Sequence, residues 1–398
     1  MKKLLLAIKT ATLSDQTKII LIRVIGAAIM AVFIKLLIND YGYNVVGKLA
    51  LIIVSGELLR YLGSFGIQTG IMQIPQALSR SYFDLAFCVI ATVVIVIIWF
   101  LIIPFFGNYF TSYSLLYACS MLFEEVYVST LKRAQKPILA SSIGMFGNLI
   151  LLLWFALSNY HNFDILLIFS IFKFSIPLLL LSFLSMRMIG SFQITEIKQY
   201  YPFIKKSLKG MTLVPILSIS ILWFYKNFAD INLSEKAFGL FESSFKLGYH
   251  YLILIHSGLM IKYHSDTISI PNHLQRKKLI ESLQRALVFF GIPWFLILCF
   301  HDQIWVLLYS KTDIIDSNIT LIITFGSLSY FLSEFIGWSI YIRDNFRKFS
   351  SIYLIRFLSL FILVYLIDDV DEFILAQIWL IINLITLFYS LWLFRLIR

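Results

Sequence analysis

Residues 17–40 read TKIILIRVIGAAIMAVFIKLLIND, an apolar run of helix length, and the turn YGYN at 41–44 joins them to a second run, VVGKLALIIVSGELLRYL at 45–62. A related run, KAFGLFESSFKLGYHYLIL, occupies residues 236–254, about 190 residues further along. This similarity predicts a chain made of two related halves. Two related helix bundles in a hydrophobic chain are typical of transporters, because they give two bodies that can rock about a central site.

The composition indicates a membrane protein. Apolar residues make up 60% of the sequence and charged residues 14%, whereas soluble proteins carry roughly 25% charged residues. A helix needs about 20 apolar residues to cross roughly 30 Å of hydrocarbon. The apolar runs have that length and lack the short alternating pattern of an outer-membrane barrel. We therefore expect an all-α polytopic membrane protein.

About twelve such runs fit into the 398 residues and leave short loops between them. We place them at 17–38, 45–66, 84–106, 110–131, 138–158, 163–186, 208–229, 237–262, 284–308, 316–341, 348–367 and 373–394. One of the two longest stretches outside the runs falls between the sixth and the seventh. The sequence therefore predicts two six-helix lobes, 1–190 and 208–398, with a cytoplasmic linker at 191–207.

Basic residues in the loops predict the orientation, since Lys and Arg in short loops stay on the cytoplasmic side. Counted on alternate sides of the runs, they gather on the side that holds both termini, while the acidic cluster DDVDE at 368–372 lies on the other side. Both termini are therefore predicted to be cytoplasmic. The formal net charge of +11 then reflects loops near anionic lipid head groups, and we expect no nucleic-acid partner.

The three cysteines, Cys88, Cys119 and Cys299, each stand alone in an apolar run, with no C-x-x-C pair and no histidine cluster nearby in the sequence. Isolated cysteines of this kind are typical of packed core positions. We therefore expect neither a metal site nor a cofactor.

Four segments carry a resemblance to a known family. The first half has NDYGYNVVG at 39–47 and LGSFGI at 62–67, and the second half has the apolar run 240–264 and then IWVLLYS at 304–310. Together with the basic start, this pattern resembles the O-antigen translocase branch of the oligosaccharide flippases, in the multidrug/oligosaccharidyl-lipid/polysaccharide exporter superfamily. It is similar to the enterobacterial common antigen flippases over nearly the whole chain, in pattern more than in identity.

The resemblance implies a flippase that moves an undecaprenyl-diphosphate-linked oligosaccharide repeat unit, of O-antigen or a related surface polysaccharide, from the cytoplasmic to the periplasmic leaflet by alternating access. It implies a place in the bacterial inner membrane and in lipopolysaccharide biosynthesis, with membrane lipids and other polysaccharide-assembly membrane proteins as partners. It also implies a cationic central cavity. The negative charge of a diphosphate cannot cross hydrocarbon without compensation, so the carrier must offer charged groups and hydrogen bonds inside the helix bundle.

Cations within the apolar runs are the candidate contacts for the substrate head group. Lys173 lies near the middle of the sixth run and Arg356 midway along the eleventh, too deep to reach water easily. Arg23 and Lys246 lie in the first and the eighth runs. Structural alternatives remain, because Arg23 can extend to the membrane surface and Arg356 can pair with an acidic residue of a neighbouring helix.

Acidic residues within the runs are candidates for gating or coupling. Glu57 has Arg60 three positions later, and both would lie on one helix face. Glu242 has Lys246 four positions later, with His250 one turn further. Each pair either neutralises itself in a cavity wall or forms a switch that responds to protons or substrate.

Glu124 and Glu334 occupy matching places, each nine residues before a loop arginine, Arg133 and Arg343. Carboxylates at equivalent positions of the fourth and tenth runs would close a cytoplasmic gate by pairing with basic groups. A location at the membrane surface is the structural alternative. Pro293, inside the ninth run, predicts a bend in that helix.

Two other functions fit parts of the pattern. A cation-coupled multidrug antiporter of the same superfamily would be expected to carry a carboxylate in the first run, and residues 19–38 contain none. A polymerase or glycosyltransferase would need a long catalytic loop or an acidic soluble face, and the exterior loops are short. We therefore expect a transporter that is not an enzyme and keep the antiporter as the alternative.

Overall fold

The computed structural model describes residues 15–65, 81–133, 136–157, 213–250, 272–309, 313–342, 346–367 and 369–395, with single positions between 164 and 179 and between 252 and 256. Within these ranges every regular element is helical. The elements are α2 (Asp15–Tyr41), α3 (Asn44–Ser64), α5 (Ser81–Phe106), α6 (Ser112–Arg133), α7 (Pro137–Leu157), α10 (Leu213–Asn232), α11 (Glu235–Phe245), the π-helical turn η4 (Lys246–His250), α13 (Asn272–Leu308), α14 (Ser317–Ile342), α15 (Phe346–Leu366) and α16 (Glu372–Arg395).

Eleven of the twelve predicted spans coincide with these helices, which confirms the all-α prediction. The sixth span, at 163–186, lies almost wholly outside the described residues, and the eighth is described mainly over 235–250. α13 begins at Asn272, twelve residues before its predicted start. The ninth span is therefore extended at its start by residues 272–283, which include Arg276, Lys277 and Lys278.

Six of the described helices, α2, α5, α7, α14, α15 and α16, are long and apolar enough to cross a membrane. On α5 the side chains of Val89, Val93, Ile97 and Phe100 remain exposed. Hydrocarbon suits such a surface, and helices satisfy their backbone hydrogen bonds internally, as a lipid environment requires. The chain is a multi-pass membrane protein.

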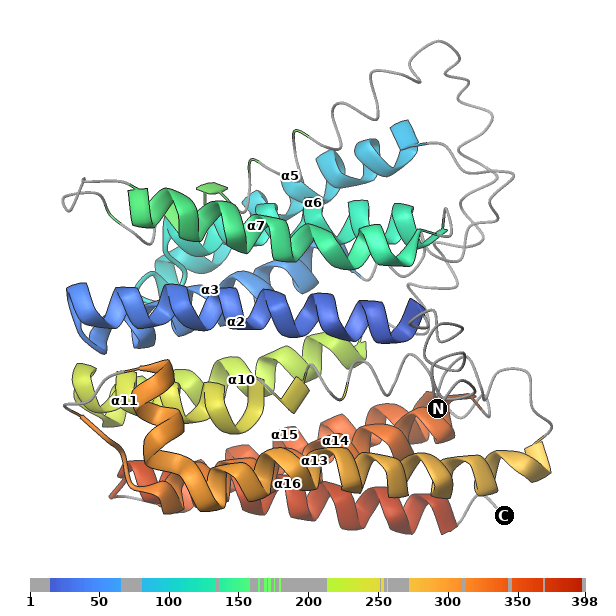
Figure 1. Cartoon of the computed structure of the whole chain (residues 1–398). Helices are drawn as coiled ribbons and strands as arrows, with labels where there is room; N and C mark the ends of the chain where they lie inside the picture. Colours follow the sequence, from blue (N-terminus) through green and yellow to red (C-terminus); the bar gives the residue numbers. More distant parts are fainter. Residues whose placement is uncertain are drawn as a thin grey trace, which may run out of the picture.

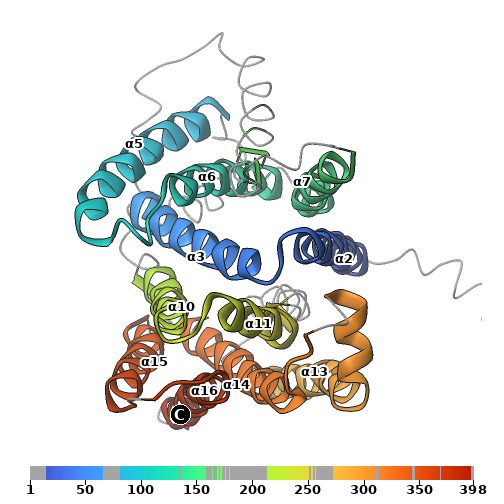
Figure 2. The same ribbon diagram turned by 90° about the vertical axis from the view of Figure 1, so that its left-hand side faces the viewer.

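The helices pack as two lobes (Figure 2). The first lobe contains α2, α3, α5, α6 and α7, and the second contains α10, α11 and α13 to α16; α3 lies against α10 and α11 where the lobes meet. The start of α2 and the end of α16 lie at the same end of the bundle (Figure 1), as an even number of crossings produces. The predicted linker, 191–207, lies outside the described residues.

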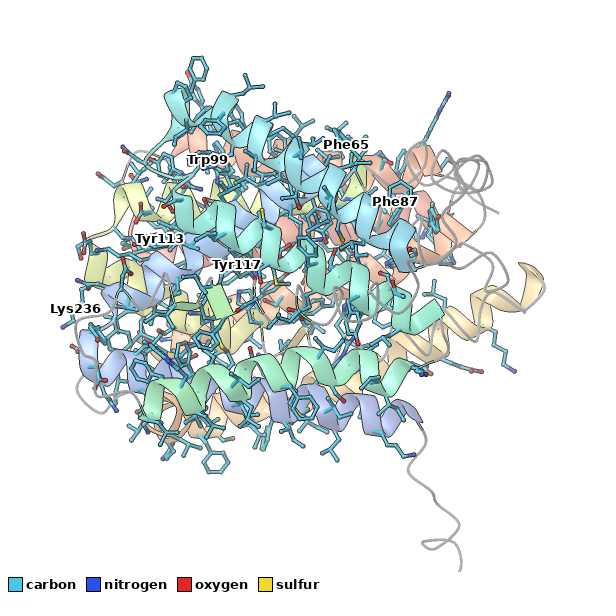
Figure 3. The ribbon with its side chains drawn as sticks, turned by 90° about the horizontal axis from the view of Figure 1, so that it is seen from above. Phe65, Phe87, Trp99, Tyr113, Tyr117 and Lys236 are labelled. Carbon is cyan, nitrogen blue, oxygen red and sulfur yellow. The ribbon has the colours of Figure 1, made fainter. Side chains whose placement is uncertain are left out.

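Aromatic residues hold the helices of each lobe together. Tyr117 of α6 (Figure 3) packs so closely on α3 that a Cβ on Gly56 would lie 2.7 Å from its ring. In the second lobe, Tyr249 of η4 stacks on Phe331 of α14, with ring centroids 5.6 Å apart, and meets Trp379 of α16 edge-on. These contacts fix η4 against two neighbouring helices.

The α2–α3 turn packs against the start of α11. Gly42, in the turn, has a φ of 77°, a conformation that favours glycine. A Cβ on Gly239 would collide with the carbonyl oxygen of Tyr43, and a Cβ on Gly47 would lie 2.6 Å from the ring of Phe238. Gly47 and Gly239 belong to the two runs that the sequence predicts to be related, and these runs meet each other across the lobes.

α13 is broken near its end. Phe300 has non-helical dihedral angles, φ −134° and ψ 24°. The break lies seven residues beyond Pro293, the position at which a bend was predicted. After it, the indole N–H of Trp305 donates to the carbonyl oxygen of Asp313 at 2.8 Å. This bond holds the last turn of α13 beside the loop that follows it.

Candidate functional site

A cavity of about 360 Å³ lies where the two lobes meet. Its first-lobe wall comes from α2, α3 and α7, and its second-lobe wall from α10 and η4. The lining residues are Ile22, Arg23, Gly26, Ala27, Met30, Ile34, Ala50, Ile53, Ser141, Gly144, Met145, Asn148, Lys226, Lys246 and His250. Much of the first-lobe lining is apolar, whereas the second-lobe lining consists of two lysines and a histidine.

A buried ion pair forms the second-lobe wall. Lys226 of α10 donates its Nζ to Glu242 Oε2 of α11 at 2.7 Å, and both side chains are almost fully buried. The other carboxylate oxygen, Oε1, is buried and has no hydrogen-bond partner in the part of the chain that the structure describes. Glu242 therefore pairs with Lys226, whereas the helical spacing had suggested Lys246.

The π-helical turn η4 carries the other two polar residues of this wall, Lys246 and His250. A π-helical turn widens a helix locally and often marks a functional position. Here its backbone is pressed against α14, because a Cβ on Gly248 would lie 2.9 Å from Thr324 Oγ1. The fold thus supports Lys246 and His250 from behind, on the side away from the cavity.

The first-lobe wall offers one cation and one amide. Arg23 lies on α2 among apolar neighbours, so the structure places it in the cavity lining. Asn148 of α7 donates its Nδ2 to the Gly26 carbonyl oxygen at 3.3 Å. Its Oδ1 is buried and accepts no hydrogen bond from any described residue. Ser141 of α7 adds a hydroxyl to the lining, so the polar side chains of this wall come from α2 and α7.

A first ion-pair cluster lies inside the first lobe, away from the cavity lining. Arg60, only 2% exposed, bonds to Glu57 on its own helix, α3, and to Glu125 of α6. Its guanidinium also lies 3.9 Å from the ring centroid of Tyr61. The Glu57–Arg60 pair thus forms as the spacing predicts, and its role in gating stays a prediction.

A second cluster lies inside the second lobe. The guanidinium of Arg356 is fully buried and donates to Glu334 Oε1 at 3.3 Å and to Ser333 Oγ at 2.6 Å. Tyr353 donates its hydroxyl to the same Glu334 carboxylate, and the Tyr330 ring centroid lies 4.1 Å from the guanidinium carbon. Arg356 and Glu334 therefore pair with each other and do not line the cavity.

The two remaining candidate residues are Lys173 and Glu124. Lys173 lies outside the described residues. Glu124 lies on α6 beside Gly144, a cavity residue, where an added Cβ would be 3.3 Å from Glu124 Oε1. It forms no salt bridge with another described residue. Its place is thus behind the cavity lining, in the first lobe.

Sequence reasoning missed three residues of these sites: Lys226, Glu125 and Asn148. Lys226 falls within the seventh predicted run, 208–229, but is not among the candidate contacts predicted from the sequence; α10 continues to Asn232, so Lys226 lies inside the helix. Glu125 and Asn148 acquire their roles from helices that are distant in sequence, which one chain alone does not reveal.

Cross-lobe contacts gather where the α2–α3 turn, the start of α11 and the end of α13 meet; we call this region the turn end. Lys35 Nζ donates to the carbonyl oxygens of Val306 at 2.9 Å and Leu307 at 2.8 Å. Tyr43 donates its hydroxyl to the Asp313 carbonyl oxygen at 3.2 Å. Figure 3 shows Lys236, in the first turn of α11, at this end of the molecule. The lobes are joined here.

No protein-family model and no curated protein matches the chain. Solved structures, however, match over nearly its whole length. The lipid II flippase MurJ, in an inward closed conformation, matches with a TM-score of 0.62 at 15% identity, over 95% of this chain and 86% of that one. An inward-facing multidrug resistance MATE family transporter of the MOP superfamily matches with a TM-score of 0.58 at 10% identity, over 94% of this chain and 93% of its own.

An outward-facing MATE family transporter matches as well, with a TM-score of 0.59 at 12% identity, over 96% of this chain and 95% of its own. These likenesses show the fold: the chain has the two-lobed helical fold of these transporters and of the flippase. A lipid flippase and drug transporters share this fold. The fold therefore does not decide between these functions, and the kind of ligand has to be inferred from the cavity residues.

Proposed function

We propose that this protein is a flippase that moves an undecaprenyl-diphosphate-linked oligosaccharide repeat unit, of O-antigen or a related surface polysaccharide, to the periplasmic leaflet of the bacterial inner membrane. The observation that carries the proposal is the cationic cavity between the lobes. Arg23, Lys226 and Lys246 line it, and Glu242 is bonded to Lys226 beside it. Among the described residues that line the cavity, three are cations and none is acidic, which favours an anionic head group.

The apolar part of the lining suits the rest of such a substrate. Met30, Ile34 and Ile53 contribute to the first-lobe wall, opposite the lysines. The diphosphate would bind the cationic wall, while the prenyl tail stays in the lipid outside the bundle. Rocking of the two lobes then exposes the head group at the other membrane face.

The contacts of the turn end support a direction for this cycle. The loop charges predict that this end faces the periplasm, and Lys35 and Tyr43 join the lobes there. A carrier closed at the periplasmic end takes up its substrate from the cytoplasmic leaflet. Separation of the lobes at the turn end is then the step that releases the head group outside.

The other charged residues have separate roles in this proposal. Arg23 and Lys246 contact the head group, and Lys173 of the sixth predicted span adds a further contact. The clusters around Arg60 and Arg356 keep each lobe rigid as it moves, because each arginine joins two helices of one lobe. Glu124 lies behind the cavity wall, where it would respond to movement of α7.

Cells provide the direct test of the substrate. In cells that lack the protein, the lipid-linked glycan pool is measured by mass spectrometry, with a leaflet-specific probe to locate it. We expect a complete repeat unit to accumulate on the cytoplasmic side. Lys246→Ala should fail to relieve this accumulation and Lys246→Arg should relieve it, at equal protein levels. Absence of a lipid-linked intermediate would refute the flippase.

The alternative is a cation-coupled multidrug antiporter; the MATE proteins that share the fold are multidrug resistance transporters. Glu242 favours it, because an antiporter needs a carboxylate near its cavity to hold the coupling ion, and Glu242 is fully buried with one unbonded oxygen. Proteoliposomes decide between the two. Export of cationic dyes driven by a proton or sodium gradient, without binding of lipid-linked diphosphates, would establish the antiporter.

A further inference from the structure

We propose that Glu242 sets the affinity of the cavity for the anionic head group, by holding Lys226 and leaving Lys246 to the substrate. The inference rests on the proposed function and deepens it, since it names the residue that limits how tightly the diphosphate is held. Glu242 is a positioning residue in this scheme, because it acts through the two lysines.

The position of Lys226 is fixed by its partners. Its Nζ lies 2.7 Å from Glu242 Oε2 and 5.2 Å from the ring centroid of Phe245. Its side chain is only 5% exposed and that of Glu242 is not exposed at all. A buried ion pair of this kind is costly to break on one side, because the remaining charge is left without a partner. Lys226 is therefore held in the wall and is not free to follow a ligand.

Lys246 is placed differently. It lines the cavity one helical turn after Glu242, and it forms no salt bridge with any residue in the described ranges. Nearby, Glu242 Oε1 is buried and accepts no hydrogen bond from the described residues. The two lysines thus share one carboxylate that has bonded only one of them. Lys246 is the lysine that remains available to a phosphate.

This sharing gives the wall two arrangements. When the cavity is empty, the free oxygen of Glu242 attracts Lys246, and an entering diphosphate must compete with it for that ammonium. When the head group leaves, the Lys246 ammonium is attracted to the Glu242 carboxylate again. A carrier needs binding that is strong enough to admit the substrate and weak enough to release it. Glu242 keeps the binding weak enough for the substrate to be released.

Four variants in a reconstituted system test this inference. The full-length protein is placed in vesicles of phosphatidylethanolamine and phosphatidylglycerol that contain a fluorescent polyprenyl-diphosphate N-acetylglucosamine. Binding and flipping of this probe are measured for Glu242→Gln, Lys226→Met, the double variant and Glu242→Asp. Glu372→Gln serves as the control, because this carboxylate lies at the start of α16, outside the cavity lining.

The expected results differ in sign. Glu242→Gln frees both lysines, so binding should become about tenfold tighter while turnover falls, and KM and kcat should decrease together. Lys226→Met leaves Glu242 to Lys246 alone, so binding should weaken about tenfold. The double variant should bind nearly as the unmodified protein does, and Glu242→Asp should restore both parameters. Glu372→Gln should change neither.

Two outcomes would overturn the inference while leaving the flippase intact. One is unchanged binding in both single variants. The other is weaker binding in Glu242→Gln, which would mark the carboxylate as a merely structural support. If Glu242→Gln does not insert, Lys226→Met and Glu242→Asp carry the test, since the first must weaken binding and the second must preserve it. If the unmodified protein neither binds nor flips the probe, the proposed function itself fails.

Discussion

Lys35 Nζ lies 2.8 Å from the carbonyl oxygen of Leu307, so a side chain of the first lobe caps the last turn of α13 in the second lobe. The last carbonyl groups of a helix have no partner within it, and a cation there also meets the negative end of the helix dipole. The same ammonium donates to Val306 at 2.9 Å. One lysine thus joins the lobes by two hydrogen bonds, which must break before the turn end can open.

Lys35→Met should shift the protein toward conformations that are open at the turn end. The site is partly exposed, so we expect the two hydrogen bonds to contribute about 1 kcal/mol, which corresponds to roughly a fivefold change in population. Electron–electron distance measurements between spin labels at Asn39 and Asn232, both exposed, report the change. The distance distribution should gain a longer component.

Lys48→Met is the matched control for this change. Lys48 also joins the lobes, through a salt bridge of 3.6 Å to Glu235, but both side chains are more than half exposed. Exposed pairs of this kind contribute little, since water screens them. An equal shift of the spin-label distances in both variants would show that the total charge at the turn end controls the opening, and that the hydrogen bonds of Lys35 to α13 do not.

Gly239→Ala should also open the turn end, and more strongly. Its Cβ would collide with the backbone carbonyl oxygen of Tyr43, an atom that cannot move without shifting the α2–α3 turn. Overpacking at a rigid contact costs about 1–3 kcal/mol. The same spin-label distances and the flipping rate measure the effect.

Gly147→Ala provides the comparison, because a Cβ there meets no atom within 4 Å. Alanine also favours helix over glycine. This variant should keep the spin-label distances and the flipping rate of the unmodified protein. Similar losses in both variants would mean that the close approach at Gly239 has no special importance.

Arg356→Met should destabilise the second lobe. It leaves the buried Glu334 carboxylate without its cation, and breaking a buried pair from one side costs about 3–5 kcal/mol. A lower unfolding temperature in detergent is the expected result. Arg356→Met with Glu334→Gln should recover part of the loss. A stable single variant that fails to flip substrate would instead place Arg356 in the substrate path.

Closure through Tyr43 should not depend on pH in the physiological range. Burial raises the pKa of this hydroxyl to about 12, above its ordinary value of 10, so it stays a donor to the Asp313 carbonyl oxygen. A raised pKa means that the contribution is complete below about pH 10 and is lost as the pH rises toward 12. The spin-label distances should be constant from about pH 6 to 9, in Tyr43→Phe as in the unmodified protein. A pH-dependent shift confined to the unmodified protein would contradict this assignment.

The helices could be predicted from the sequence because each depends on local composition. The runs at 45–66 and 373–394 need only enough apolar residues to cross the bilayer, and α3 and α16 begin and end within two residues of them. The break in α13 could not be placed, because it lies at Phe300, seven residues beyond Pro293, and no residue pattern there marks it.

The ion pairs of the candidate site could be predicted only in part, because most of them join different helices. Spacing predicts Glu57 with Arg60 correctly, since both lie on one helix. The helical spacing suggests Lys246 as the partner of Glu242, whereas in the structure Lys226, from another helix, forms the ion pair with this carboxylate. A cation in the middle of an apolar run has the same appearance whether it faces a cavity or, like Arg356, a carboxylate on a neighbouring helix.

The π-helical turn η4 changes the direction in which the side chains at the end of its helix point. A π turn amounts to one additional residue in a helix, and each residue of an α-helix advances by about 100°. The related run in the first half, α3, is α-helical from Asn44 to Ser64. The turn therefore rotates the residues at its end, His250 among them, by about 100° relative to an uninterrupted α-helix such as α3, and so changes which side chains of this run face the cavity.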